Sequence, residues 1–209
     1  MMVRRLFLTL AAAFLLAAGT FAVPAHAQDG EAAQKFIAEL ARQAITTVAD
    51  RQLPQAERES RFRKLFVTAF DLSEIGRFVL SRSWRTATPD QQQEFLSLFE
   101  DITVLTWSKR FQDYNGESLE TVGVTRDGDR GWVVDSHILR AQGQQIPVQW
   151  KVKQSEDGSF HVIDIVVEGV SMAITHRSDY AAALQANGGK MDGLLSTMRT
   201  KLDQLKAAG

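Results

Sequence analysis

The residues of this sequence that could act together chemically lie in one short segment after an apolar run. Ser171 follows Glu168 and Gly169, and His176 and Asp179 come shortly after it. A strand, a tight turn, a serine and a helix form the outline of the nucleophile elbow of a serine hydrolase. The segment therefore raises the question of whether Ser171 is a catalytic nucleophile.

The surroundings of Ser171 argue against a hydrolase. Residues 169–173 read Gly-x-Ser-x-Ala, and the elbow belongs in a largely parallel sheet, whereas the strands predicted here form an antiparallel meander. The only histidine after Ser171 is His176, about a turn and a half along the same predicted helix, which points it away from the hydroxyl group. We expect instead that Gly169 permits the exit from the strand and that Ser171 caps the next helix.

Other catalytic and metal-binding patterns are missing from the sequence. It has no cysteine, which excludes thiol catalysis, disulfides and Cys-ligated metals. The histidines at 137, 161 and 176 do not have the spacing of metal ligands, and no phosphate loop or dinucleotide fingerprint is present. We therefore expect no catalytic residue, no metal and no cofactor. One enzymatic alternative stays open, in which Asp135 or Asp164 serves as the acid–base group of a cone-shaped α+β isomerase.

The amino-terminal segment 1–27 has the pattern of a secretory signal peptide. Arg4 and Arg5 precede an apolar stretch of short length, and an Ala-x-Ala sequence ends at Ala27. A retained membrane anchor is the alternative, and a span needs about 20 apolar residues. We expect cleavage after Ala27, export to the periplasm, and a single domain over residues 28–209.

The charge of the chain disfavours nucleic acid as a partner. The chain has 24 basic and 25 acidic residues, and the first 27 residues hold two arginines and no acid. The predicted mature chain then carries 22 basic against 25 acidic residues, a formal net charge of about −3. Binding to phosphate backbones requires a basic surplus, which this chain lacks.

Hydrophobic periodicity predicts helices at both ends of the chain and strands between them. Apolar residues recur at helical spacing in the first and last thirds, and Thr88 with Gln91 forms a capping-box pattern. The period then changes to two, with short turn-rich links between the segments. The predicted helices are 31–50, 56–70, 72–81, 88–114, 171–186 and 190–206, and the predicted strands are 118–126, 131–141, 144–154 and 160–168.

This order predicts an α+β fold. It consists of one curved antiparallel sheet of about four strands, covered by the amino- and carboxy-terminal helices. The helix at 88–114 is apolar over more than one face, which indicates burial on several sides. A cone-like sheet under helices can enclose an apolar cavity between the two layers, as in NTF2-like folds.

Residues 164–180 resemble the signature of the MlaC-type periplasmic lipid carriers, also called toluene-tolerance auxiliary components. That signature has an aspartate in a strand, then Glu-Gly-x-Ser, an aliphatic stretch, an Arg-Ser pair and an aromatic residue. The chain departs from it in having Tyr180 where Phe is commoner and His176 where Tyr is frequent. The resemblance extends over most of residues 34–206, and Arg82-Ser83-Trp84 is similar to the branch associated with hopanoid gene clusters. The matching residues are Asp164, Glu168, Gly169, Ser171, Arg177 and Tyr180.

The resemblance implies a soluble carrier and not an enzyme. Such a carrier moves a phospholipid between an outer-membrane lipoprotein complex and an inner-membrane ABC transporter with its substrate-binding subunit, and so maintains lipid asymmetry of the outer membrane. The two acyl chains lie between sheet and helices and the headgroup faces solvent. Arg177 is expected to form an ion pair with Asp179 or Glu168, and contact with a partner is the alternative. An adaptor that only bridges membrane complexes, and a carrier of hopanoid-related lipid, stay open as alternatives.

Surplus apolar positions predict the lining of the lipid cavity. They lie on the helices before the sheet and on the apolar faces of the strands, where a close-packed core would otherwise form. The predicted lipid-binding residues are Phe70, Phe78, Phe99, Ile102, Val133, Ile146, Val148, Trp150 and Val166.

Overall fold

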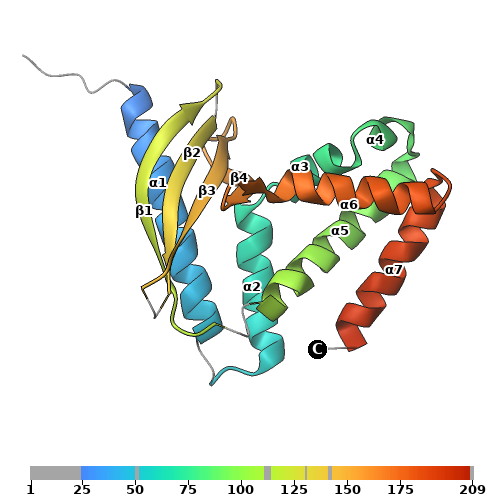
Figure 1. Ribbon diagram of the computed structural model, residues 1–209, viewed down its shortest axis with the longest axis horizontal. Coiled ribbons are helices and arrows are strands. Elements are labelled where there is room, and N and C mark those ends of the chain that lie inside the picture. Colours follow the sequence, from blue (N-terminus) through green and yellow to red (C-terminus); the bar gives the residue numbers. More distant parts are fainter. Residues whose placement is uncertain (1–24, 50–51, 111–113, 130, 141–142, 208–209) are drawn as a thin grey trace, which may run out of the picture.

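The computed structural model describes residues 25–49, 52–110, 114–129, 131–140 and 143–207, and Figure 1 shows helices, then strands, then helices along the chain. This is the predicted α+β fold. The helices are α1 (Ala25–Ala49), α2 (Gln55–Ala69), α3 (Leu72–Leu80), α4 (Arg82–Thr86), α5 (Pro89–Arg110), α6 (Met172–Ala186) and α7 (Met191–Ala207). The strands are β1 (Ser118–Asp127), β2 (Gly131–Leu139), β3 (Gln145–Gln154), β4 (Phe160–Val167) and β5 (Val170–Ser171).

The element boundaries differ from the prediction mainly in four places, one of which is the start of α1 at Ala25, six residues before the predicted start at Glu31. The short elements α4 and β5 were not predicted, because five and two residues give no usable period. Helix α5 begins with the predicted capping box, in which Gln91 N donates to Thr88 Oγ1 at 3.2 Å and Thr88 N donates to Gln91 Oε1 at 3.0 Å. Tyr114 lies outside that helix, so the predicted end was too late.

Most of the predicted signal peptide lies outside the described residues, and its cleavage stays a prediction. Within the part of the chain that the structure describes, no helix has the length and apolar character that crossing a membrane requires.

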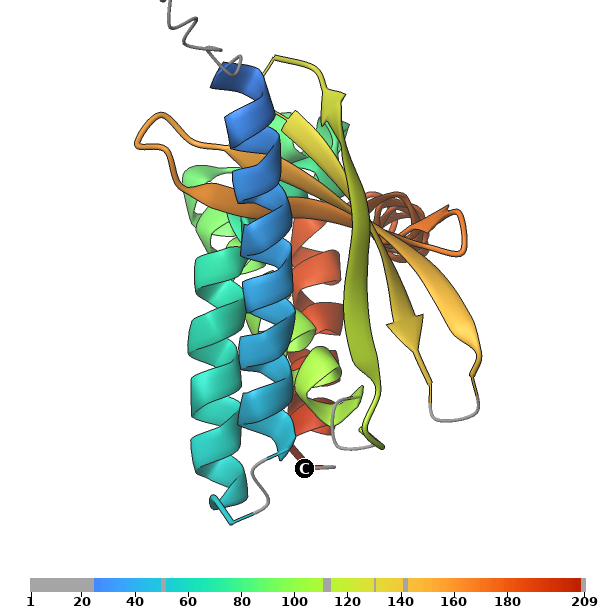
Figure 2. The ribbon, with the colours of Figure 1, turned by 90° about the vertical axis from the view of Figure 1, so that its left-hand side faces the viewer.

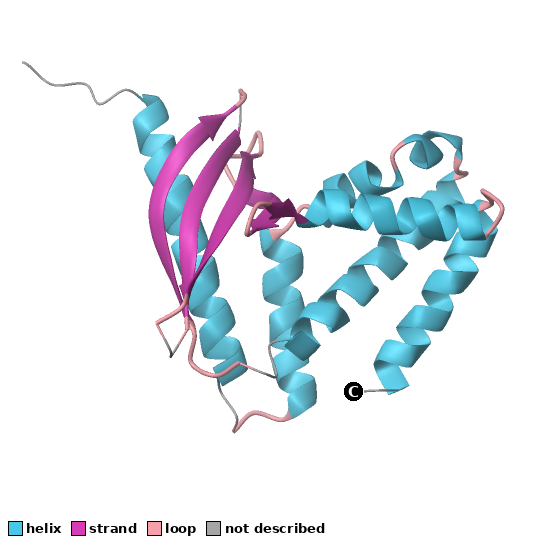
Figure 3. Cartoon of the chain, viewed as in Figure 1, coloured by secondary structure: helices cyan, strands magenta, loops and turns pink. Residues whose placement is uncertain are grey.

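The five strands form one antiparallel sheet in sequence order, from β1 at one edge to β5 at the other. Helix α1 runs across one face of this sheet, and α2 returns beside it in the opposite direction (Figure 2). Helices α3 to α7 gather on the other side of α2 (Figure 3), where α7 packs on α5 and α6 packs on α3. The amino- and carboxy-terminal helices therefore cover the sheet unequally. Helix α1 lies along the sheet, whereas α6 touches it only at β4 and β5.

The apolar interior is divided into two cores. One core lies among the helices and includes Phe95, Phe99 and Leu195. The other lies between α1 and the sheet and includes Ile37 and Val134. The division leaves a space between sheet and helices that neither core fills.

Phe70 joins the two cores at the end of α2. Its ring stacks on Phe66 with centroids 4.1 Å apart and an interplanar angle of 14°, and it packs against residues of both cores. Its backbone forms an isolated bridge with Val162 of β4, and Asp71 N donates to the Val162 carbonyl at 3.1 Å. This contact fixes the helical layer to the fourth strand.

A second junction lies where β4 turns into α6. The buried carboxylate of Asp164 accepts hydrogen bonds from Ser171 Oγ at 2.7 Å and from Ala173 N at 2.9 Å. Ser171 Oγ also accepts from Ile174 N at 3.1 Å, which is the predicted capping role. The turn between them needs left-handed backbone at Glu168 (φ +50°) and Gly169 (φ +82°), the second of which favours glycine.

Replacing Asp164 by alanine should therefore destabilise the protein strongly. The Asp164→Ala variant leaves Ser171 Oγ and Ala173 N without their acceptor, and we expect the free energy of unfolding to fall by about 2–4 kcal/mol. Urea denaturation followed by circular dichroism measures the loss. The exposed Asp203 on α7 provides the matched control, because Asp203→Ala should change stability by less than about 0.5 kcal/mol. Equal losses in the two variants would contradict the role of Asp164.

His176 makes the stability of α6 depend on pH. Its ring meets the ring of Phe99 edge-on, with centroids 6.4 Å apart. Desolvation by burial lowers the pKa of His176 below 6.5, an effect that Arg110 reinforces and Asp179 opposes. As the pH falls through about 6.5, His176 is protonated in the unfolded chain before it is protonated in the folded protein. The neutral ring therefore contributes its full share to the free energy of unfolding above that pH, and this share is lost on acidification.

The variant His176→Phe keeps the ring contact but cannot be protonated. Between pH 7 and pH 5 its free energy of unfolding should fall less steeply than that of the unmodified protein. Urea denaturation at a series of pH values gives both slopes. If the two slopes coincide, the neutral state of His176 contributes nothing to folding.

Candidate functional site

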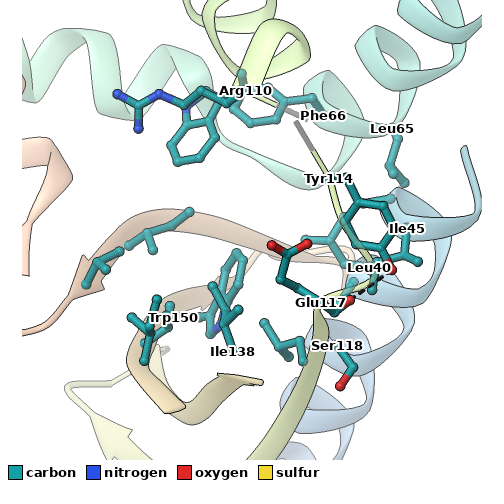
Figure 4. Close-up of a pocket in the computed structure, with 18 of the residues that line it drawn as sticks. Leu40, Ile45, Leu65, Phe66, Arg110, Tyr114, Glu117, Ser118, Ile138 and Trp150 are labelled. Carbon is teal, nitrogen blue, oxygen red and sulfur yellow. Dashed lines mark hydrogen bonds between the residues drawn. The ribbon is translucent and has the colours of Figure 1, made fainter. Parts of the chain in front are cut away.

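A pocket of about 440 Å³ lies between the sheet and the helices. Figure 4 shows its walls, which come from α1, α2, the end of α5 and the first four strands. A volume of this size falls within the range of about 300–1,000 Å³ that is usual for small-molecule sites. The pocket occupies the space left where the two cores diverge.

The sheet contributes cross-strand pairs of apolar residues to the pocket. Ile138 of β2 pairs with Leu119 of β1 and with Ile146 of β3, and all three line the pocket. Trp150 pairs with Ile165 in the same way on β3 and β4. Cross-strand partners point to the same face of a sheet, so the strands present a continuous apolar floor.

A bulge in β4 decides which of its residues reach this floor. The register shifts between Lys151 and Val152, which leaves Ile163 without a partner on β3. Before the bulge Val162 belongs to the core under α1. After it the alternation is reversed, so that Ile165 and Val167 line the pocket while Asp164 and Val166 face the opposite side.

The helices complete the apolar walls. One face of α1 lines the pocket. On this face Ala41 and Ala44 lie between larger residues, and their small side chains leave space toward the sheet. The second helix supplies aromatic rings. The lining residues from these two helices are Leu40, Ala41, Ala44, Ile45, Phe62, Leu65 and Phe66.

Hydrogen bonds hold Trp150 in place at the pocket wall. Its Nε1 donates to Ser136 Oγ at 2.9 Å, and Ser136 Oγ donates to the Val148 carbonyl at 3.0 Å. Ser136 is buried, so both of these bonds are shielded from water. The indole therefore presents a fixed apolar surface whose one polar atom already has a partner.

Charged groups line one end of the pocket. Arg110 comes from the end of α5, Glu117 precedes β1 and Arg140 follows β2. Figure 4 shows the carboxylate of Glu117 extending toward the open part of the pocket, next to Tyr114, whose hydroxyl donates to the Glu117 carbonyl at 2.9 Å.

The charges at this end are partly organised by the backbone. A hydrogen bond of 2.8 Å from Asn115 N lowers the pKa of Glu117, and Arg140 lowers it further. Arg110 lies over the ring of Trp107, 5.2 Å from its centroid. The pocket is thus apolar along its walls and ionic at one end, which suits an amphiphile.

The structure brings four of the predicted lipid-binding residues to this pocket, namely Phe70, Ile146, Val148 and Trp150. Val133 pairs with Lys151 and Val166 pairs with Gln149, and both lie on the opposite face of the sheet. Phe78 lies on α3 with 42% of its surface exposed. Phe99 and Ile102 line a second, smaller pocket between α5, α6 and α7.

Sequence reasoning missed the contributions of α1 and α2, of Trp107, of Leu119 and Ile138 on the first two strands, and of the end of β4. The apolar stripes of α1 and α2 were visible in the sequence, but their spacing cannot tell a core residue from a pocket residue. At Ile165 and Val167 the bulge reversed the simple alternation. The helical spacing of Ile37, Leu40, Ala44 and Ile45 was the one signal that pointed toward this wall.

The acids of the enzymatic alternative lie outside the pocket. Asp135 accepts a hydrogen bond from Gln149 Nε2 at 2.8 Å, on the face of the sheet turned away from α1. Both oxygens of Asp164 are used in the junction with α6. Among the described residues, no group of three or more His, Asp or Glu side chains could hold a metal ion.

The signature residues occupy the corner between β4 and α6. Tyr180 packs edge-on against Phe95 and Phe99, with ring centroids 5.6 and 5.8 Å away. Arg177 is absent from the ion pairs of the described residues, contrary to the expectation of a pair with Asp179 or Glu168. It lies instead over the exposed ring of Phe78, 5.3 Å from the centroid.

Comparisons with known proteins agree with this architecture. The family model described as MlaC protein matches residues 38–200. The toluene tolerance protein ttg2D of Pseudomonas putida is 23% identical over 124 residues, a region that spans 59% of this chain and 57% of that relative's length.

A solved structure has the same fold. It is the phospholipid-binding protein of Ralstonia solanacearum in complex with a phospholipid, with a TM-score of 0.72 at 20% identity over 83% of this chain and 98% of the other. The family model covers well over half of the sequence, including both sides of the pocket and the corner at Asp164. This chain therefore belongs to the MlaC family.

Proposed function

We propose that this protein is a periplasmic phospholipid carrier. Acyl chains occupy the 440 Å³ pocket between sheet and helices, and the headgroup lies at the end lined by Arg110, Glu117 and Arg140. The observation that carries the proposal is this combination of apolar walls with charges at one end. The phospholipid bound by the Ralstonia solanacearum protein of the same fold supports it.

The physical need for such a carrier is large. Two acyl chains contain about 30 methylenes, and exposing each one to water costs about 0.8 kcal/mol of free energy. A free phospholipid therefore crosses an aqueous compartment very rarely. A folded chain with an unfilled apolar pocket replaces the lost hydrocarbon contacts and keeps the cargo dispersed.

Membership of the MlaC family supports a proposed route for the lipid. The carrier would exchange lipid with an outer-membrane lipoprotein complex and with an inner-membrane ABC transporter through its substrate-binding subunit, and so maintain lipid asymmetry of the outer membrane. Its location in the periplasm requires the predicted signal peptide to direct export and the single domain 28–209 to fold there. The name of the Pseudomonas putida relative, a toluene tolerance protein, suits a role in the outer-membrane barrier.

The proposal assigns no catalytic residue and no cofactor, because the bound lipid is cargo. The isomerase alternative is not carried forward, since Asp135 and Asp164 lie away from the pocket. A hopanoid-related lipid is an alternative cargo, and extraction of the bound molecule distinguishes a diacyl lipid from a fused-ring one.

Filling the pocket should weaken lipid binding about ten-fold. Ala44 lines the pocket from α1, so Ala44→Trp places an indole where acyl chains would lie. Native mass spectrometry of freshly purified protein should find about one phospholipid per unmodified chain and about ten-fold less on this variant, because overpacking costs about 1–3 kcal/mol.

The exposed Ala182 on α6 provides the control, since Ala182→Trp adds the same side chain outside the pocket. Transfer of a fluorescent phospholipid between vesicles should fall in Ala44→Trp and persist in Ala182→Trp. An unmodified protein that purifies empty and takes up no lipid from vesicles would contradict the proposal.

A further inference from the structure

The floor of the pocket between sheet and helices is built of rungs, each made of residues that pair across neighbouring strands and point to the same face. Successive rungs on one face lie about 6.8 Å apart, because alternate residues share a face and a strand rises about 3.4 Å per residue. Three rungs reach the pocket. Their lining residues are Leu119, Ile138 and Ile146 in the first, Val148 and Val167 in the second, and Trp150 and Ile165 in the third.

The fourth rung belongs to the core under α1. It consists of Trp132, Val152 and Val162, which are 3%, 1% and 0% exposed. Helix α1 is divided in the same way, because Ile37 is fully buried in that core whereas Ala44, two turns later, lines the pocket. The pocket therefore has a blind end along the sheet, and the third rung forms it.

Trp150 is the larger side chain of this third rung. It lines the pocket and also packs against the core under α1. Its Nε1 donates to Ser136 Oγ at 2.9 Å, so the indole extends from β3 across β2. Ser136 and Val134 are buried there, although Val148 and Trp150, their partners on β3, line the pocket. The indole thus covers β2 at this point and stops the pocket from continuing along that strand.

Ser136 keeps the indole in this position. Its hydroxyl group accepts the bond from Trp150 and donates to the Val148 carbonyl at 3.0 Å, so β3 sets the orientation of the hydroxyl group. Because Ser136 is buried, the bond to the indole is shielded from water, and turning the ring away would leave its N–H without a partner. Ser136 is therefore a positioning residue for Trp150.

We propose that Trp150, positioned by Ser136, limits the length of the acyl chain that this protein accepts. The inference rests on the proposed function, and it adds the class of lipid that the carrier selects. One acyl chain lies along the floor of the sheet, with its headgroup beside Glu117 and Arg140 and its methyl end against the indole. Glu117 precedes β1 and Arg140 follows β2, so both flank the first rung.

The register of the strands gives the length of this path. Arg140 lies six residues from Val134, the partner of Trp150 on β2, which corresponds to about 20 Å along the strand. With bonds of about 1.5 Å at tetrahedral angles, an extended hydrocarbon advances about 1.25 Å per carbon. The limit is therefore about 16 carbons, the length of a palmitoyl chain.

Shortening the side chain at position 150 should shift the preference to longer lipids. The mature protein is equilibrated with mixed micelles that hold equal amounts of dipalmitoyl and distearoyl phosphatidylglycerol, and native mass spectrometry gives the ratio of the two bound lipids. The unmodified protein should bind about ten-fold less distearoyl lipid, because the extra methylenes find no apolar surface in the pocket. In Trp150→Leu the share of distearoyl lipid should rise at least about five-fold.

Three further variants make the test specific. Trp150→Phe removes less volume, preserves more of the packing, and should raise the share of distearoyl lipid about two-fold. Trp84→Leu, which shortens a half-buried indole in the helical core, is the matched control and should leave the ratio as it was. Ser136→Ala should raise the share about two-fold and make the Trp150 Nε1–H exchange with deuterium at least about ten-fold faster.

The proposed function and the length limit fail separately in this experiment. The total lipid bound reports on the carrier function, and the ratio of the two lipids reports on the limit. An unmodified protein that binds both lipids equally would keep the function and overturn the limit. So would a ratio that is the same in Trp150→Leu and Trp150→Phe as in the unmodified protein. An indole exchange rate unaffected by Ser136→Ala would overturn the role of Ser136.

Discussion

The pocket exists because the protein has two apolar cores that separate on either side of Phe70. One core joins α1 to the sheet and the other joins the remaining helices, and they meet where Phe70 stacks on Phe66 and bridges to Val162. A single core of the same composition would close on itself at the density usual for protein interiors. Two cores fixed at one junction leave a lined space next to it, and the proposed function depends on that space.

The corner between β4 and α6 fixes the carboxy-terminal helices to the sheet. A buried carboxylate that accepts two hydrogen bonds from the start of α6 sets where that helix leaves the sheet. Helix α6 packs on α3, so this corner is a second attachment of the helical layer to the sheet, beside the contact at Val162. The residues that resembled a catalytic serine motif thus form this corner, where Ser171 caps α6.

Polarity in the larger pocket is divided between an apolar part and an ionic part. In the larger one the indole of Trp150 has its only polar atom bonded to Ser136, while Arg110, Glu117 and Arg140 lie at one end. This separation lets hydrocarbon leave water without removing a charged group from it. Trp107 lines both this pocket and the smaller one between α5, α6 and α7, and Arg110 lies over its ring.

The sequence by itself determined the class of fold, the order of its elements, the capping box at Thr88 and the corner at Ser171, because these depend on short-range periodicity and local hydrogen bonds. It also carried the resemblance that identified the family. Only the tertiary structure decided which apolar residues line the pocket. The bulge at Ile163 put Ile165 and Val167 on its floor and turned Val166 away, and the packing of α5 on α7 placed Phe99 in a different pocket. A hydrophobic residue has the same spacing whether it meets another side chain or an empty space, so only the three-dimensional arrangement can tell core from cavity.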